Sequence, residues 1–426
     1  MSARALILFL FPLAALAQQP TIAISGANFR PTPLAIAAPA TQDEAAKKAA
    51  AEFDATLTFD FQACGLFQLL DRKSFLADAK EGVTAVTINF PNWVNVGAEA
   101  LVKTQLSTDG ETLHADLRLF NVNAGRELVK ASDSMSVKDV RRLAHKLANA
   151  VYKEFSKETG PFETKIAFVR KTKEGKDVYL ADWDGRNAVA IASGGINVLP
   201  AVVPDHTGAA FTSYRRGQPE LFVSRGGEVK PLVTVGRMVS GAAYSPDGKR
   251  LAYSVSDGEH AEIYISAADG SGPKAVTDTK FFLNSSPAWS PDGKKLAFVS
   301  NRAGNPQVYT MNVDGSGVER LTFQGNYNQT PAWSPRGDII AFTARDERNA
   351  FDIFTVELST KKIKRLTQDA ANNEEPSFSP NGRLIIFTST RGGGGSNQLY
   401  VMTFDGNNQI ALPTEKGEYS TPDWGS

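Results

Sequence analysis

Cysteine and histidine are scarce in this chain. Its 426 residues include one cysteine and four histidines. A single cysteine excludes an intramolecular disulfide, and Cys64 is expected to be a small buried residue rather than a reactive thiol. The histidines do not show metal-ligand spacing, so a histidine-built metal site is not expected. They are His114, His145, His206 and His260, and His145 is predicted to be a satisfied residue on the surface of a helix.

An excess of charge of one sign is also missing. Lys and Arg together number 46, and so do Asp and Glu. Nucleic-acid binding needs a basic excess that neutralises phosphates, so a nucleic-acid partner is not expected. The sequence has no polybasic run that would favour binding to a membrane surface.

Long apolar runs are confined to the first residues. Arg4 precedes an uncharged apolar run, Ala5 to Leu16, and small residues end it before a cleavage point between Ala17 and Gln18. The run is too short to span a bilayer. We therefore expect residues 1–17 to be a signal peptide, and the mature protein to be exported and soluble, without membrane insertion.

A triplet of an acidic or amide residue, an aliphatic residue and an aromatic residue occurs six times. Its aromatic residues follow one another at steps of 43, 42, 45, 45 and 46 residues. This period is typical of a repeat unit that forms one small four-stranded sheet, so it predicts an all-β six-bladed β-propeller over residues 161–426. The triplets are Asp177-Val178-Tyr179, Glu220-Leu221-Phe222, Glu262-Ile263-Tyr264, Gln307-Val308-Tyr309, Asp352-Ile353-Phe354 and Gln398-Leu399-Tyr400.

A second position of the unit keeps the same register. A pair made of an apolar residue and the aromatic residue that follows it recurs at steps of 43, 42, 45, 44 and 45 residues. Two independent positions that keep step along the chain make chance a poor explanation. The pairs are Ala167-Phe168, Ala210-Phe211, Ala252-Tyr253, Ala297-Phe298, Ala341-Phe342 and Ile386-Phe387.

The C-terminal tail is expected to close the ring. Residues 420–424 match the first strand of the fourth and fifth units, whereas the first unit has no such strand before Lys165. We predict that the tail supplies the innermost strand of the first blade, which leaves no open edge. The six blades are then residues 165–193 with the tail, 194–235, 236–280, 281–325, 326–368 and 369–416.

Residues 18–160 lack the repeat and are predicted to form an N-terminal α/β (α+β) domain. Thr41 and Glu44 have the pattern of a capping box ahead of an Ala-rich helix. The alternation from Leu113 to Leu119 predicts a half-buried strand with a hairpin partner on each side. A second helix, over Val140 to Phe155, is expected to present one apolar face.

The tight turn between the first two strands of a unit carries a repeated aspartate. It is present as Asp247 and Asp292 but is replaced by Arg336 and Asn381 in the fifth and sixth units. A metal ligand or acid catalyst could not be exchanged for arginine, whereas a turn residue can. The adjacent pair Glu374-Glu375 is expected to lie in a solvated loop. Catalytic residues, cofactors and metals are not expected.

The domain order and several local motifs resemble the TolB family, the periplasmic propeller proteins of the Tol-Pal envelope system. The resemblance covers essentially the whole mature chain. The motifs that carry it are Asp60 with Gly65, Phe67, Asp71 and Arg72, the passage Glu158-Thr159-Gly160 through Ile166-Ala167-Phe168, and the blades with Pro-Ala-Trp-Ser-Pro-Asp-Gly. It implies a non-enzymatic periplasmic adaptor that supports outer-membrane integrity and envelope constriction at cell division.

One face of the propeller is expected to bind a partner. The loops between the second and third strands, and the segments that lead into each new unit, are longer than the turns on the other face, and recognition usually evolves in such loops. The resemblance implies that the lipoprotein Pal binds at this loop-rich face. The expected contact residues are Met238, Asn284, Ser285, Asn328, Gln329, Asn373, Glu374 and Tyr419.

The mature N-terminus is the second expected binding segment. The resemblance implies that it engages TolA, and residues 21–24 form a β-capable stretch that could add to a sheet edge of a partner or act as an ordinary first strand. The expected residues are Gln18, Gln19, Thr21, Ile22 and Ile24. Other envelope proteins and colicin-like hijackers are further expected partners, and a monomer is expected. The alternative function is an exported sugar lyase or hydrolase that acts in the propeller channel.

Overall fold

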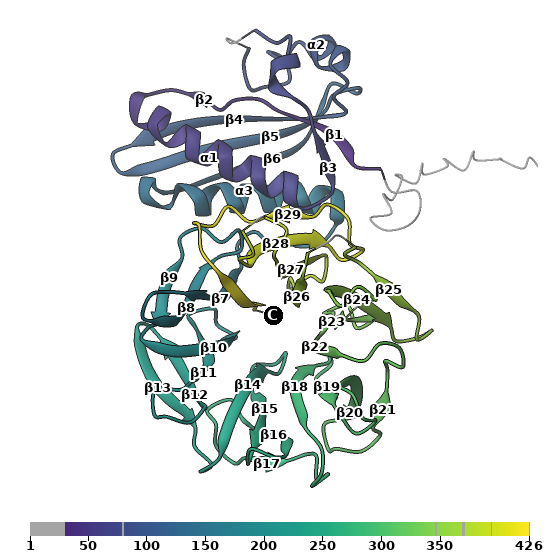
Figure 1. Ribbon diagram of the computed structural model, residues 1–426. Coiled ribbons are helices and arrows are strands. Elements are labelled where there is room, and N and C mark those ends of the chain that lie inside the picture. Colours follow the sequence, from purple (N-terminus) through teal and green to yellow (C-terminus); the bar gives the residue numbers. More distant parts are fainter. Residues whose placement is uncertain (1–29, 79–80, 346, 369–370, 393, 426) are drawn as a thin grey trace, which may run out of the picture.

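The computed structural model describes residues 30–78, 81–345, 347–368, 371–392 and 394–425. An N-terminal domain of helices on a sheet lies beside a ring of small sheets (Figure 1). The expected signal peptide and the β-capable N-terminal segment lie outside the described residues. Within the described ranges, no helix is long and apolar enough to cross a membrane.

The N-terminal domain is built on a mixed sheet in the order β3-β1-β4-β5-β6, with β2 beside β4. The predicted alternating strand is β5, and its expected hairpin partners β4 and β6 lie antiparallel on either side of it. The strands are β1 (Thr32–Ile36), β2 (Ala40–Thr41), β3 (Phe67–Leu69), β4 (Ala100–Asp109), β5 (Thr112–Asn121) and β6 (Arg126–Ser136).

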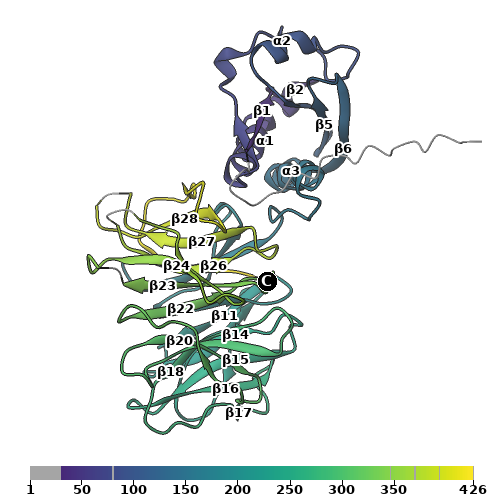
Figure 2. The same ribbon diagram turned by 90° about the vertical axis from the view of Figure 1, so that its right-hand side faces the viewer.

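Two long helices cover one face of this sheet and meet the propeller (Figures 1 and 2). The long helices are α1 (Glu44–Ala63) and α3 (Val140–Ser156). The domain also has a short helix α2 (Phe90–Asn95) and the 3-10 turns η1 (Arg72–Ser74) and η2 (Val137–Asp139). The expected capping box at α1 is wrong. Asp43 is the N-cap, because its carboxylate accepts from the Ala46 amide at 2.8 Å and also from the Thr108 amide at 2.7 Å.

Four separate four-stranded antiparallel sheets form most of the ring. In chain order they are β14 (Met238–Tyr244), β15 (Arg250–Ser256), β16 (Ala261–Ala267) and β17 (Lys274–Ala275); β18 (Asn284–Trp289), β19 (Lys295–Ser300), β20 (Gln307–Asn312) and β21 (Glu319–Arg320); β22 (Asn328–Trp333), β23 (Ile339–Arg345), β24 (Phe351–Glu357) and β25 (Ile363–Arg365); β26 (Asn373–Phe378), β27 (Leu384–Ser389), β28 (Gln398–Thr403) and β29 (Ile410–Ala411).

The remaining strands of the ring form one eight-stranded sheet. They are β7 (Lys165–Lys171), β8 (Gly175–Asp182), β9 (Val189–Ala192), β10 (Gly195–Val202), β11 (Gly208–Ser213), β12 (Glu220–Arg225), β13 (Glu228–Val233) and β30 (Tyr419–Trp424). The predicted pairing of the tail is confirmed, because β30 lies antiparallel to β7 with Tyr419 opposite Arg170 and Trp424 opposite Ile166. The last strand of the chain therefore completes the sheet that begins the ring.

The two repeated aromatic positions of the sequence are direct cross-strand neighbours. In all six cases the aromatic residue of the apolar pair lies opposite that of the triplet, as Phe298 lies opposite Tyr309. Ring centroids in these pairs are 5.8 to 6.3 Å apart. Such pairs stabilise a sheet by roughly 0.2–1 kcal/mol each, which explains why both positions keep one period.

The cores of the two domains are continuous. One cluster of buried apolar residues runs from α1 and α3 into the first and last sheets of the ring. Trp183, which follows β8, is fully buried and stacks on Trp424 with ring centroids 5.8 Å apart. The indole of Trp424 donates to the Thr164 hydroxyl in the linker at 2.7 Å. The C-terminal strand thus contributes to the domain joint as well as to the ring.

Candidate functional site

The eight residues predicted for the loop-rich face all lie at the start of innermost strands. Each inner strand runs from the loop-rich face to the tight-turn face, so its first residues lie at the mouth of the central channel. Ser285, Gln329 and Glu374 occupy the second position of their strands. The first positions are held by Met238, Asn284, Asn328, Asn373 and Tyr419. The candidates Gln18, Gln19, Thr21, Ile22 and Ile24, and the cleavage residues Ala17 and Gln18, lie outside the described residues.

Four of these side chains are buried, so they do not offer the direct contacts that were expected of them. Asn284 and Asn373 are 0% exposed, and Asn328 and Tyr419 are nearly so. The reason is that these residues already belong to the inner strands, as Asn284 begins β18, and are not part of the loops that precede them. The other four candidates are half-buried and reach solvent.

The buried asparagines join neighbouring blades. In three successive blade contacts, the asparagine side-chain amide donates to the acidic or amide residue that begins the triplet of the preceding blade. This residue therefore accepts a hydrogen bond from the next inner strand, which is the reason for its polarity. The pairs are Asn284 with Glu262 (2.9 Å), Asn328 with Gln307 (2.8 Å) and Asn373 with Asp352 (2.9 Å).

An arginine completes this network on the loop-rich face. Arg302 donates to the Asn284 carboxamide oxygen at 3.0 Å and to the Ser300 hydroxyl at 3.0 Å. Its guanidinium carbon also lies 5.4 Å from the ring centroid of Phe298 and 5.1 Å from that of Tyr309. The same Asn, Ser and Arg arrangement recurs at Asn197, Ser213 and Arg215 and at Asn373, Ser389 and Arg391. The loops therefore start from a rigid base.

Exposed aromatic residues mark the same face. Phe281 is 78% exposed and Phe323 is 67% exposed. Phe281 lies in the segment that connects β17 to β18, which also holds Leu283 (44% exposed), and Phe323 lies in the segment that connects β21 to β22. Exposed aromatic residues are typical of protein-binding surfaces. The sequence interpretation chose amides at the channel mouth and missed these residues, although two phenylalanines in otherwise polar connections are a visible signal.

The inner strands that surround the central channel share a ring of irregular residues. The third or an equivalent position of each inner strand has a positive φ and interrupts the register with the second strand. The cavity that these strands enclose has a volume of about 300 Å³. The positive-φ residues are Leu199 (52°), Gly241 (67°), Ser286 (53°), Thr330 (48°), Glu375 (60°) and Thr421 (45°).

Two carboxyl groups line this cavity. Burial raises the pKa of Glu375 to about 7 and that of Asp423 to about 6. Glu375 accepts from the Thr421 amide at 2.6 Å, and Asp423 accepts from the Val202 amide at 2.7 Å. Each carboxyl group therefore satisfies a backbone donor beside an irregular position. The expectation that Glu374-Glu375 lies in a solvated loop is wrong, because both residues belong to β26.

The tight-turn face carries the joint with the N-terminal domain. Where the repeated aspartate is retained, it accepts from the serine of its own turn, as Asp292 does from Ser290 at 2.6 Å. The turn interpretation of this aspartate is supported by that contact. The two turns that lack it face the N-terminal domain. Asn381 donates to the Thr159 carbonyl at 3.1 Å, and Arg336 donates to Glu158 at 3.1 Å.

Glu158 is the centre of this part of the joint. Arg383 binds it through two nitrogens, at 2.9 and 2.7 Å, in addition to the contact from Arg336. The hydrogen bonds from Arg383 lower the pKa of Glu158 although partial burial opposes them. Departures from the repeat were therefore a signal of the domain interface that the sequence interpretation treated only as evidence of a turn.

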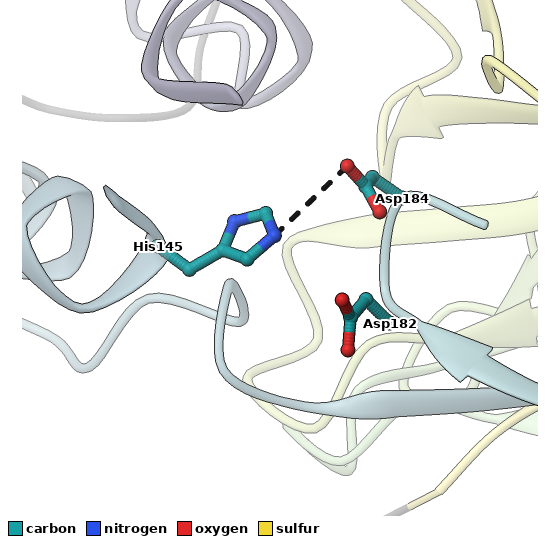
Figure 3. Close-up of side chains that lie close together, drawn as sticks. All are labelled: His145, Asp182 and Asp184. Carbon is teal, nitrogen blue, oxygen red and sulfur yellow. Dashed lines mark ion pairs between the residues drawn. The ribbon is translucent and has the colours of Figure 1, made fainter. Parts of the chain in front are cut away.

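A second part of the joint is a buried cluster of charged residues around His145. His145 lies on α3 and is 2% exposed, so the prediction of a surface residue is wrong. Its Nδ1 lies 2.8 Å from the Asp60 carboxylate on α1, and Trp183 donates to Asp60 at 3.1 Å. Figure 3 shows the imidazole facing Asp184 and Asp182 of the propeller, with Nε2 3.9 Å from the Asp184 carboxylate.

His145, Asp182 and Asp184 have the composition of a metal site but a poor fit to one. One ligand atom from each lies within 4.8 Å of the others. However, Arg141 already forms an ion pair with Asp184, and Lys165 lies 2.6 Å from Asp182. Since both carboxylates have cationic partners, a metal ion would have to displace them. The trio is better described as part of an ion-pair network between the domains.

The comparisons with known proteins agree with this architecture. Residues 20–128 match the family model described as the TolB amino-terminal domain, and residues 152–426 match that described as the TolB beta propeller domain. The chain belongs to the TolB family. The Tol-Pal system protein TolB of Myxococcus xanthus (strain DK1622) is 60% identical over 419 residues, which cover 98% of this chain and 97% of that protein.

Two further TolB proteins are similar. The Tol-Pal system protein TolB of Anaeromyxobacter dehalogenans (strain 2CP-1) is 42% identical over 276 residues, 64% of this chain and 63% of the relative. The crystal structure of TolB from Acinetobacter baumannii has a TM-score of 0.79 at 23% identity, and the match covers 93% of this chain and 96% of that one. At that identity the structural likeness shows the fold of an N-terminal α/β domain and a β-propeller.

Proposed function

We propose that this TolB-family chain is a non-enzymatic periplasmic adaptor of the Tol-Pal system. In this proposal residues 1–17 are removed on export, the loop-rich face of the propeller binds the lipoprotein Pal, and residues 18–25 bind TolA. The adaptor would thereby support outer-membrane integrity and envelope constriction at cell division. The similar Myxococcus xanthus protein is named a Tol-Pal system protein, which supports the part of the proposal that assigns this chain to that system.

The observation that carries the proposal is the contrast between the two faces of the ring. The hydrogen bonds and ion pairs described above between the domains involve turns of the tight-turn face, including Asn381, Arg336 and Asp184. The loop-rich face carries the exposed residues Phe281 and Phe323, and Asn, Ser and Arg side chains fix the strand ends on the same face. Exposed aromatic anchors on a rigid base favour a protein partner.

Binding of immobilised Pal by the mature protein tests this role of the loop-rich face. Phe281→Ser with Phe323→Ser is expected to weaken binding at least tenfold, because aromatic anchors contribute most to such interfaces. Val318→Ser is the matched control, since Val318 is 41% exposed in a turn of the opposite face. Equal affinity of the double variant and the control would contradict the proposal for these residues. No binding of Pal by the wild-type chain would contradict the adaptor as a whole.

The proposed TolA segment is tested by a deletion. A mature chain that lacks residues 18–25 is expected to lose TolA binding and to keep Pal binding, because the two proposed sites are different segments of the chain. A chain with the eight residues in scrambled order controls for length. Retention of TolA binding by both variants would overturn the proposed role of Gln18, Gln19, Thr21, Ile22 and Ile24.

We also propose that the eight-stranded sheet comprises two blades, which gives six blades in total. Strands β8 and β10 share only two residue pairs, Gly175 with Gly195 and Lys176 with Ile196. Six inner strands, two of them in this sheet, each have one positive-φ residue at an equivalent place. The alternative of a sugar lyase or hydrolase has less support, because Glu375 and Asp423 accept backbone hydrogen bonds, and the lining includes neither histidine nor arginine among the described residues.

A further inference from the structure

We propose that His145 is a proton-dependent latch between the two domains of this chain. With its imidazole protonated, His145 holds α1 and α3 against the turn that follows β8 in the propeller. When the imidazole loses its proton, this part of the joint weakens and the domains become freer to move. The proposal concerns the joint alone and does not depend on which partners the protein binds.

The position of His145 supports a latch because three structural elements meet at its ring. Asp60 of α1 faces Nδ1 at 2.8 Å, and Asp184 of the propeller turn lies 3.9 Å from Nε2. Trp183 of the same turn donates to Asp60, and its ring centroid lies 6.4 Å from that of His145. Arg141, one helical turn before His145, pairs with Asp184 and donates to the Thr56 hydroxyl at 2.9 Å. Movement of the propeller away from α3 would separate Trp183 and Asp184 from the N-terminal residues that they contact.

When all three carboxyl groups around it are ionised, the charges around His145 balance only if His145 is protonated. Three carboxylates face the cluster, from Asp60, Asp182 and Asp184, whereas the fixed cations are Arg141 and Lys165. Protonated His145 supplies the third positive charge. Neutral His145 leaves an uncompensated negative charge at sites that are at most about 15% exposed, which disfavours the closed joint.

The titration of the cluster has the sign that a latch requires. Burial alone would lower the pKa of His145, but the Asp60 and Asp184 carboxylates outweigh burial and raise it above 6.5. A raised histidine pKa stabilises the closed joint fully below pH 6.5, and this stabilisation is lost as the pH rises through the folded value. Burial raises the pKa of Asp60 to about 6, which also makes the folded cluster retain protons.

The contact at Nε2 makes the latch able to open. This buried nitrogen has no hydrogen-bond partner, and the Asp184 oxygen is too distant for a hydrogen bond. The protonated ring is therefore attracted to the propeller turn by charge without a fully formed bond. By contrast, the contact to Asp60 on the N-terminal side is short. We infer that the joint separates between His145 and Asp184, and that His145 stays with Asp60.

Histidine-selective NMR of the mature chain tests the protonation step. The imidazole signal of His145, assigned with His145→Gln, is expected to titrate above pH 6.5. Asp184→Asn is expected to lower that midpoint while the protein stays folded, because it removes the propeller carboxylate. An imidazole that titrates at or below 6.5, or does not respond to Asp184→Asn, would overturn the latch.

Hydrogen exchange of the wild-type chain tests the opening step. After correction for the pH dependence of chemical exchange, peptides over residues 182–187 and over α3 are expected to lose protection several-fold between pH 6 and pH 8.5. His145→Gln is expected to abolish this change, whereas the exposed control His114→Gln keeps it. Protection that is independent of pH in wild type, or a change that persists in His145→Gln, would show that His145 does not control the joint. If His145→Gln does not fold, the wild-type and Asp184→Asn profiles decide.

Discussion

The two faces of the propeller use the same repeat for opposite purposes. On the tight-turn face, Arg336, Asn381 and Asp184 form contacts with the N-terminal domain. On the loop-rich face, buried asparagines and arginines fix the strand ends, and Phe281 and Phe323 remain exposed. The difference shows that the meaning of a departure from the repeat depends on the face of the propeller on which it lies. A charged replacement in a short turn indicated an internal contact, whereas an aromatic residue in a longer connection indicates an external one.

The largest expected effect is at the joint. Trp183→Ala removes a fully buried ring that stacks on Trp424 and packs beside Phe59 and Phe162. We expect a loss of about 3–5 kcal/mol in the free energy of unfolding, as is usual for buried tryptophan truncated to alanine. Urea denaturation measures it, with the highly exposed Val86→Ala as control. A loss below about 1 kcal/mol would show that the tight-turn face does not bear the joint.

A pair of adjacent residues sharpens the contrast on the loop-rich face. Asn328→Ala removes the hydrogen bonds that its side-chain amide donates to Gln307 and to the Gln324 carbonyl, and is expected to cost about 2–3 kcal/mol of stability. Gln329→Ala changes a half-buried neighbour and is expected to cost less than about 0.5 kcal/mol. Thermal unfolding of both variants measures the difference. Similar losses would mean that the buried Asn328 and its half-buried neighbour Gln329 do not differ in their contribution to stability.

The channel offers a test that depends on pH. The pKa of Glu375 rises from 4.5 to about 7, so burial of its carboxylate costs stability progressively from pH 4.5 to about pH 7 and fully above it. Glu375→Gln removes this cost and is expected to stabilise the protein by about 1–2 kcal/mol at pH 8 but not at pH 4. Denaturation at both pH values measures it, and Asp292→Asn is the control in an exposed turn. An equal effect at both pH values would contradict the assignment.

The smallest expected effect is at Glu158. Its pKa is lowered, first by the Arg383 hydrogen bonds, so its ion pair stabilises the joint above pH 4.5 and is lost as the pH falls through the lower folded value. Glu158→Gln is expected to cost about 1 kcal/mol at pH 7 and less at pH 3, because a half-exposed ion pair is partly screened. Asp247→Asn controls for a turn remote from the joint. A cost that grows on acidification would have the wrong sign.

The periodic parts of the fold could be predicted from the sequence, and the contacts between units could not. The period of the triplets and the match between the tail and the inner strands indicated the propeller and the position of β30. Strand starts such as Asn284 were missed, because a buried asparagine is indistinguishable from a loop asparagine until its partner Glu262 is placed beside it. His145 was misplaced for a similar reason, since three of its neighbours lie far away in the sequence.

The binding face could be predicted in outline but not in detail. Loop lengths indicated which face is open, while the exposed or buried state of each residue depends on strand register, which shifts at the positive-φ residue of the inner strand. Asn328 and Gln329 are adjacent amides of similar chemistry, yet one is buried in a blade contact and the other reaches solvent. The exposed residues of the binding face could therefore be identified only from the structure.

The position of Tyr419–Trp424 affects how the ring folds during synthesis. The strand that borders Lys165–Lys171 is made long after it, so the ring stays open until Tyr419–Trp424 has been translated. Premature termination by even ten residues would leave an early strand with bare amides and carbonyls, ready to pair with a neighbouring nascent chain. The ring can therefore close only in a chain that includes Tyr419–Trp424.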